Sequence, residues 1–196
     1  SVALIENDTT LTYRQLRERS ELIARLVPKR ALVLFLADNT MDSVCLYVGF
    51  LENGIVPLMT KRDLDRQSFD ALVKAYHPGY AWVSADYDCP GRVIYSSDAH
   101  SLKKLECGPT ALNVDLALLL ATSGSTGSQK YVRLSYANVY SNASSISQYL
   151  DIKSSDRAIT TLPLSYSYGL SIINSHLISG ASIVLTERTL FDREFW

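Results

Sequence analysis

The sequence predicts an α/β fold, with parallel sheets flanked by helices. Amphipathic helical segments alternate with short apolar strands, and this alternation restarts after a polar stretch in the middle of the chain. The longest apolar runs, 31–37 and 116–121, have the length of buried strands. Such a pattern favours a parallel sheet covered by helices over a sandwich or a helical bundle.

In the first half, helices are predicted at 12–27, 42–53 and 65–76. Thr12 and Gln15 have the spacing of a capping box at the start of the first helix, and Gly54 is a stop signal after the second. A His-Pro-Gly sequence ends the third helix. The strands predicted around these helices are 31–36, 55–59, 80–83 and 92–95.

Residues 96–110 are polar and contain Gly108-Pro109, so we expect them to connect two halves. The halves are a first α/β lobe, 1–108, and a second α/β segment, 109–196. In the second half, strands are predicted at 116–121, 130–134, 158–161 and 181–185, and helices at 138–150 and 168–178. Residues 191–196 resemble the first turn of another helix, and we expect the chain to be cut there from a longer protein.

Composition excludes several classes of protein. The 196 residues are 47% hydrophobic and 20% charged, which suffices for a core without disulfides or metals. The net charge is −1 and the basic residues are scattered, so no nucleic acid and no acidic membrane surface is expected as a partner. The apolar runs are shorter than the roughly 20 residues that a membrane-spanning helix needs, and residues 1–10 do not resemble a signal peptide.

The cysteines indicate a reducing, cytoplasmic setting. Cys45, Cys89 and Cys107 are odd in number, widely spaced and without a CxxC pair, which argues against a disulfide framework and a zinc site. We expect Cys45, which has apolar neighbours, to be a small core residue.

No histidine is predicted to act as a base. His77, at a helix end, and His100, in the polar connection, are expected to be solvated, and His176 to be packed or partly exposed in a helix. Two pairs of aspartates at i,i+2 spacing are expected to cap helices or face solvent rather than bind metal: Asp63 with Asp65 and Asp86 with Asp88.

A loop rich in small polar residues joins the predicted strands 116–121 and 130–134. Its sequence is Thr122-Ser123-Gly124-Ser125-Thr126-Gly127-Ser128-Gln129-Lys130. Two glycines allow close backbone approach, hydroxyls and amides are short donors, and one lysine supplies charge, which together suit a polyphosphate. A flexible linker is the alternative, although the loop joins two apolar strands. The Walker A spacing is absent, so a P-loop nucleotidase is disfavoured.

This loop resembles the phosphate-loop signature of the adenylate-forming superfamily, which includes acyl- and aryl-CoA synthetases, peptide-synthetase adenylation domains and luciferases. The pattern is roughly [ST]-[SG]-G-[ST]-[ST]-G-x-P-K, and Gln129 stands where proline is usual. Three more segments are similar, in the family's order: 11–16 (LTYRQL), 51–58 (LENGIVPL) and 162–169 (LPLSYSYG), with Tyr166 at a histidine or aromatic position. Residues 134–139, after the loop, are also similar to the family, with Tyr136 in place of a common histidine. The resemblance covers nearly the whole chain and implies a partial amino-terminal domain of such an enzyme.

The resemblance implies a reaction and roles for residues. In the family, a carboxylate attacks the α-phosphate of Mg-ATP to give an acyl-adenylate and pyrophosphate, and the acyl group usually passes to the thiol of coenzyme A or a carrier protein. ATP and Mg²⁺ are the implied cofactors. Thr122, Ser123, Gly124, Ser125, Thr126, Gly127 and Ser128 would bind the ATP phosphates. Lys130 would neutralise charge, and Tyr166 would lie near the α-phosphate and the acid. Because Pro163 follows the predicted strand 158–161, we expect Tyr166 to share a cleft with the loop.

In the family, the segments that stack adenine, hold ribose and Mg²⁺, and supply the lid lysine would follow Trp196. We therefore expect residues 1–196 alone to be inactive, and no metal ligand is assigned to them. Two other functions are a noncatalytic nucleotide- or ligand-binding module that uses the same loop, and an interaction domain with a flexible linker. The sequence identifies neither the acid nor the acceptor thiol.

Overall fold

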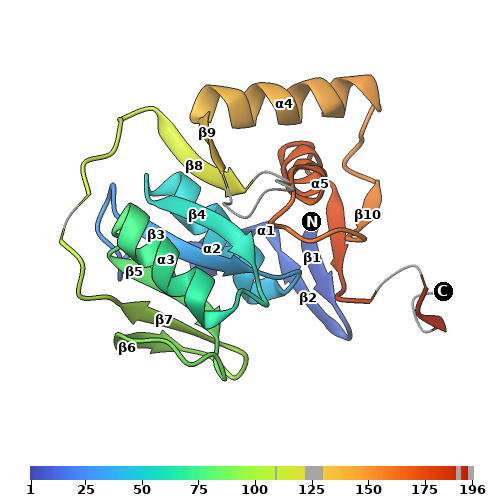
Figure 1. Cartoon of the computed structure of the whole chain (residues 1–196). Helices are drawn as coiled ribbons and strands as arrows, with labels where there is room; N and C mark the ends of the chain where they lie inside the picture. The colour runs from blue at the N-terminus through green and yellow to red at the C-terminus, as the bar shows by residue number, and fades with distance from the viewer. Residues whose placement is uncertain (109, 122–129, 189–190, 194–196) are drawn as a thin grey trace.

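The computed structural model describes residues 1–108, 110–121, 130–188 and 191–193. Within these residues the chain forms a seven-stranded sheet, a four-stranded sheet and five helices (Figure 1). The strand order is β6-β7-β5-β3-β4-β8-β9 in the large sheet and β10-β11-β1-β2 in the small one. The α/β class is confirmed. The helical turn predicted at 191–196 falls partly outside the described residues.

Four parallel strands form the centre of the large sheet: β3 (Leu32–Ala37), β4 (Val56–Lys61), β5 (Tyr80–Ser84) and β8 (Leu116–Ala121). Every residue of β3 is buried, and Leu34 pairs with Leu58 of β4. Strands covered on both faces read as continuous apolar runs rather than alternating ones, which is why the sequence revealed them.

Helices cover both faces of this sheet. α2 (Met41–Glu52) packs with α1 (Tyr13–Ala24) into the core that contains Phe35 and Trp82, and α3 (Arg66–Tyr76) packs Phe69 against the opposite face. The predicted capping box of Thr12 and Gln15 is present. Local capping residues therefore determine where a helix starts, and tertiary packing determines which face of the helix is buried.

The edges of the large sheet are antiparallel. β6 (Arg92–Ser96) and β7 (His100–Lys104) extend it beyond β5, and β9 (Tyr131–Ser135) extends it beyond β8. The prediction that 96–110 is a plain connection is therefore wrong for residues 100–104. These residues are mostly polar and lack the apolar pattern of a strand, and the side-chain partner of His100, Asp38, is distant in the sequence.

The small sheet joins the two ends of the chain. β1 (Val2–Glu6), which pairs antiparallel with β2 (Thr9–Thr12), lies parallel to β11 (Ser182–Leu185), and β10 (Arg157–Ile159) pairs with β11 on its other side. α4 (Tyr136–Tyr149) packs against α5 (Ser167–Ile178), where the Ser147 and Ser179 hydroxyl oxygens are 2.6 Å apart. α4 and α5 lie together on the same side of the molecule (Figure 1).

The histidines follow the predictions in two cases out of three. His77 is exposed, and His176 is partly exposed in α5. His100 is not solvated, because only 1% of it is exposed and its Nε2 lies 2.7 Å from Oδ2 of Asp38. Asp38 pairs with Nε2, and Asp42 Oδ2 lies 3.8 Å from Nδ1, so two carboxylates face the ring and allow it to enter the core.

Two further predictions hold. Cys45 is buried, and burial raises the pKa of its thiol to about 12. Asp65 caps α3 by accepting a hydrogen bond from the Ser68 amide. None of the helices in the described ranges is long and apolar enough to cross a membrane.

Candidate functional site

The predicted phosphate loop is attached to two neighbouring antiparallel strands. β8 ends at Ala121, which pairs with Tyr131 at the start of β9. Thr122, Ser123, Gly124, Ser125, Thr126, Gly127 and Ser128, and also Gln129, lie outside the described residues. Lys130 is exposed and directly precedes β9. The segments on either side of the loop are therefore held by one pair of strands.

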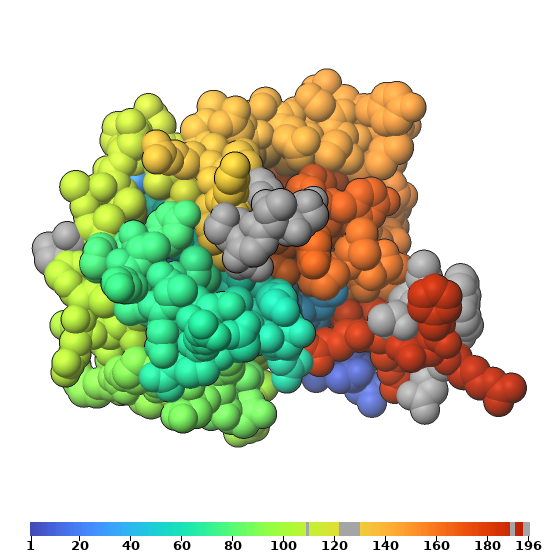
Figure 2. All heavy atoms as spheres, in the orientation of Figure 1, coloured from blue at the N-terminus to red at the C-terminus, as the bar shows by residue number. Residues whose placement is uncertain are grey.

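A cavity of about 640 Å³ opens beside this strand pair. Its walls come from the ends of β8 and β9, from α4 and from the start of α5: Leu120, Ala121, Val132, Leu134, Asn138, Val139, Asn142, Tyr166, Ser167, Leu170, Ser171 and Asn174. In Figure 2 the surface of α5 adjoins that of α4 in this part of the molecule. Tyr166 thus shares a cavity with Ala121, the residue before the predicted loop. Lys130 is not one of the described residues that line it.

Tyr166 stands at the amino-terminal cap of α5 in a tight turn. Its amide donates to the Pro163 carbonyl at 3.0 Å, and its own carbonyl accepts from the Leu170 amide at 2.9 Å. A Cβ atom on Gly169 would lie 2.3 Å from the Pro163 carbonyl oxygen, so a glycine is required where α5 passes over the turn. Tyr166 is 52% exposed and is among the residues that line the cavity.

The same turn is bonded to the large sheet through Asn39, which lies between β3 and α2. The Asn39 side chain contacts the Leu162 carbonyl, the Leu164 amide and the Thr186 carbonyl. Sequence reasoning did not single out Asn39. The signal that could have drawn attention to it is its position, since it follows a buried parallel strand at the carboxyl end, where α/β proteins place their ligands.

A charged pair lies directly behind Asn39. Asp38 accepts hydrogen bonds from the Thr40 hydroxyl at 2.7 Å and the Ser43 hydroxyl at 2.6 Å, in addition to its contact with His100. Burial alone would lower the pKa of His100, but the carboxylates of Asp38 and Asp42 outweigh it and raise that pKa to about 9. His100 is therefore charged at neutral pH.

The pKa of Asp38 moves the other way. Burial alone would raise it, but the bonds from His100, Ser43 and Thr40 outweigh burial and hold it below its ordinary value. Arg62 adds a second cation, 3.7 Å from Asp38 Oδ2, and also pairs with Glu187 after β11. The carboxyl end of β3 is thus a fixed arrangement of paired charges.

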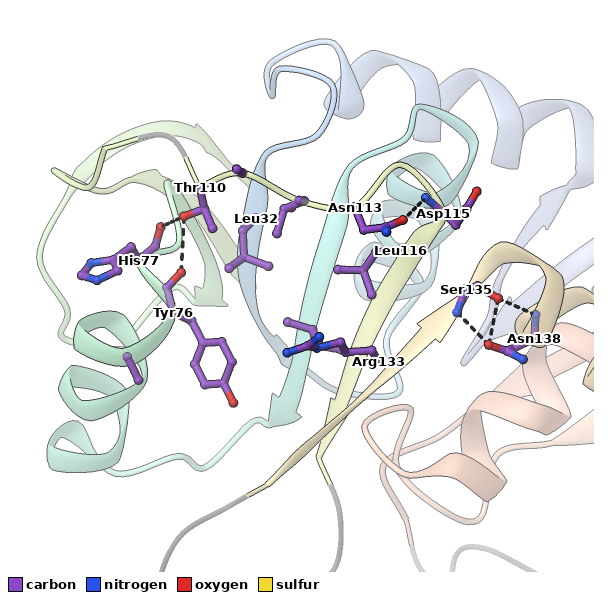
Figure 3. Close-up of a pocket in the computed structure, with 14 residues that line it drawn as sticks. Leu32, Tyr76, His77, Thr110, Asn113, Asp115, Leu116, Arg133, Ser135 and Asn138 are labelled. Carbon is purple, nitrogen blue, oxygen red and sulfur yellow. Dashed lines mark hydrogen bonds between the residues drawn. The ribbon is translucent and has the colours of Figure 1, made fainter.

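A separate cavity of about 600 Å³ lies at the other end of β8. It is lined by Leu32, Leu116 and Arg133, together with Tyr76 and His77 at the end of α3 (Figure 3). Leu116 is the first residue of β8 and Ala121 the last, so this cavity is distinct from the one that contains Tyr166. The two predicted site residues that the structure describes, Lys130 and Tyr166, do not line it.

The residues that the structure describes contain no group of three or more His, Cys, Asp or Glu side chains placed to hold a metal ion. The wall beside Tyr166 offers amides and hydroxyls instead. Such neutral donors and acceptors can bind and orient a polar substrate, and the apolar residues between them can exclude water.

The two sheets and five helices of the described residues have the fold of the amino-terminal domains of adenylate-forming enzymes. The family model for AMP-binding enzymes matches residues 1–196, and the chain belongs to that family.

Relatives in sequence include peptide synthetases and CoA ligases. The chain is 27% identical over 214 residues to gramicidin S synthase 2 from Aneurinibacillus migulanus. This alignment covers 98% of this chain and 5% of that protein. It is 28% identical over 205 residues to 2-succinylbenzoate–CoA ligase from Bacillus velezensis, covering 95% of this chain and 41% of that protein. The chain thus spans less than half of each of these relatives.

Solved structures share the fold. ATP-bound MatB from Rhodopseudomonas palustris superimposes with a TM-score of 0.80 at 18% identity, over 100% of this chain and 43% of that one. O-succinylbenzoate coenzyme A synthetase (MenE) from Bacillus subtilis, in complex with AMP, gives a TM-score of 0.75 at 22% identity, over 95% of this chain and 52% of that one.

Proposed function

We propose that this chain is the amino-terminal part of an ATP-dependent acid–thiol ligase. The observation that carries the proposal is the cavity that Tyr166 shares with Ala121, at the end of the strand that leads into the Ser/Thr/Gly-rich loop. Membership of the AMP-binding family supports ATP as the nucleotide. The relatives named as CoA ligases and peptide synthetases support a carboxylic acid as the second substrate.

The first step joins two anions. A carboxylate oxygen attacks the α-phosphorus of ATP, a new oxygen–phosphorus bond forms, and the bond to the bridging oxygen breaks to release pyrophosphate. In the second step, a thiol of coenzyme A or a carrier protein attacks the carbonyl carbon, AMP leaves, and the thiol loses its proton. The protein accelerates such a reaction chiefly by electrostatic stabilisation and by alignment.

The chain contributes to the first step through its loop and its cavity wall. Backbone amides and hydroxyls from Thr122 to Ser128 hold the β- and γ-phosphates, and Lys130 stabilises the charge that moves onto pyrophosphate. Tyr166 borders the space where the carboxylate meets the α-phosphate. Mg²⁺, bound with ATP, screens the phosphate charge. We place its protein ligands outside residues 1–196.

Pyrophosphate release measured on the full-length protein tests this function. A panel of aliphatic, aromatic and amino acids is supplied with Mg-ATP, first without and then with coenzyme A. We expect acid-dependent pyrophosphate release with at least one class of acid, and a mass-detected adenylate before any thiol is added. ATP hydrolysis that is independent of every acid, with no adenylate, would contradict the proposal.

A further inference from the structure

The side chain of Asn39 joins three segments that are far apart in the sequence. Asn39 is only 7% exposed. Its Oδ1 accepts a hydrogen bond from the Leu164 amide at 2.9 Å, and its Nδ2 donates to the Leu162 carbonyl at 3.2 Å and the Thr186 carbonyl at 3.3 Å. The side-chain amide of Asn39 thus links the end of β3 both to the turn after β10 and to the residue after β11.

An asparagine side chain fits these partners better than its acidic analogue would. One end of the group must accept from a backbone N–H, and the other must donate to two carbonyl oxygens. Aspartate would retain the acceptor but would place a second negative oxygen against both carbonyls. It would also lie next to Asp38, which His100 holds in its charged form.

The bond to Leu164 fixes the turn that carries Tyr166. Leu164 is completely buried, and two residues later Tyr166 closes the turn on the Pro163 carbonyl at 3.0 Å. Gly169 then passes so close to the same carbonyl that no Cβ atom would fit. The turn is held on one side by Asn39 and on the other by α5, so a displacement at Leu164 carries Tyr166 with it.

We propose that Asn39 is a positioning residue that holds Tyr166 at the edge of the cavity beside Ala121. It closely follows β3 of the large sheet, which also contains β8, whereas Tyr166 follows β10 of the small sheet. Asn39 therefore sets the distance across the cavity between Tyr166, which borders the proposed acid, and Ala121, which precedes the proposed phosphate loop. This inference rests on the proposed function for its catalytic consequence, but not for its structural one.

The structural consequence is measured by hydrogen–deuterium exchange on the full-length protein and its Asn39→Asp variant. We expect amides at 162–168 to exchange about tenfold faster or more in the variant, with unchanged exchange in β3 and β4. The matched control is Asn113→Asp, because exposed Asn113 uses only its oxygen to cap the Asp115 amide, at 2.8 Å, and aspartate retains that oxygen. Unchanged exchange at 162–168 in Asn39→Asp would overturn the proposal. Should Asn39→Asp not fold, the uncharged variant Asn39→Ser takes its place in both measurements.

The catalytic consequence is measured with a double-mutant cycle that includes Tyr166→Ala. Asn39→Asp should lower adenylate formation about tenfold or more when Tyr166 is present, but less than about threefold in the Tyr166→Ala background. An equal loss in both backgrounds would show that Asn39 does not act through Tyr166 and would overturn the proposal. If the unmodified protein releases no pyrophosphate with any acid, the proposed function fails, and the exchange measurement alone decides the role of Asn39.

Discussion

The imidazole of His100 lies parallel to the indole of Trp82, with ring centroids 4.9 Å apart and planes inclined by 11°. Both rings are buried, and the carboxylate of Asp38 meets the imidazole edge 2.7 Å away. The three residues come from β7, β5 and the end of β3. A charged histidine is therefore part of the core behind the candidate site, and its titration should be visible in both stability and fluorescence.

We expect the chain to lose stability as the pH rises from 7 to 10. Because the pKa of His100 is raised to about 9 in the folded chain, compared with about 6.5 when unfolded, its contribution is complete below pH ~6.5 and is lost as the pH passes through about 9. The loss is on the order of 3 kcal/mol. Urea unfolding across this range measures it. His100→Gln should flatten the pH dependence, whereas His77→Gln, which removes an exposed imidazole, should keep it. Equal slopes in the two variants would contradict the assignment.

The fluorescence of Trp82 should report the same titration. A protonated imidazole quenches an indole that it touches more strongly than a neutral one does, so emission should rise as the pH passes through about 9. The chain has two tryptophans, so the measurement uses a Trp196→Phe background. A midpoint near the ordinary histidine value of about 6.5 would show that Asp38 and Asp42 do not hold the charge.

Gly49→Ala should destabilise the packing of α2 on α1. A Cβ atom at Gly49 would lie 2.5 Å from the backbone oxygen of Ser20, so the two helices would have to move apart. Overpacking of this kind typically costs about 1 to 3 kcal/mol. Thermal unfolding measures the change. The control is Gly79→Ala, since a Cβ atom there meets nothing within 4 Å. A Gly49→Ala protein as stable as the Gly79→Ala protein would refute the close approach.

Lys130→Ala in the full-length protein should lower turnover substantially. Removing one preorganised donor to developing charge typically costs about 10²- to 10³-fold, and the proposed contact with departing pyrophosphate is of this kind. The loss should appear in kcat more than in the KM for the acid, because the contact strengthens as charge moves onto the leaving group. Lys74→Ala, on the exposed side of α3, is the control. Full activity in Lys130→Ala would remove this lysine from the site.

A protein made of residues 1–196 alone should release no pyrophosphate above background. On the proposed function, the loop contacts only the β- and γ-phosphates, and a few phosphate contacts without adenine stacking or a ribose clamp give only about millimolar affinity. Isothermal calorimetry with ATP and the pyrophosphate assay test both statements. Acid-dependent turnover by this protein would show that the family's later segments are dispensable.

Local signals made the helices and the central strands predictable. Thr12 with Gln15 and Asp65 mark helix starts by side-chain chemistry, and the apolar runs mark β3 and β8 by burial on both faces. β7 could not be predicted in the same way. Its first residue, His100, is polar in the sequence and becomes a core residue because Asp38, directly after β3, and Asp42, in α2, supply the opposite charge.

The candidate site likewise has one part that the sequence indicated and one part that it did not. Its loop has a residue pattern that carries its chemistry, so the sequence alone indicated a phosphate-binding role. Asn39 carries no such pattern, because its side chain is defined by contacts with Leu162, Leu164 and Thr186. The sequence separation of these partners conceals their contact until the two sheets are assembled.

The pairing of β1 with β11 has a consequence for the nascent chain. Leu4 leaves the ribosome long before its parallel partner Ile183 is made, because almost the whole of this segment lies between them. The large sheet, whose strands come from the residues between them, can form first, while the entropy of closing so long a loop delays the small sheet. Until then, the apolar side of β1 is exposed to chaperones and to other chains.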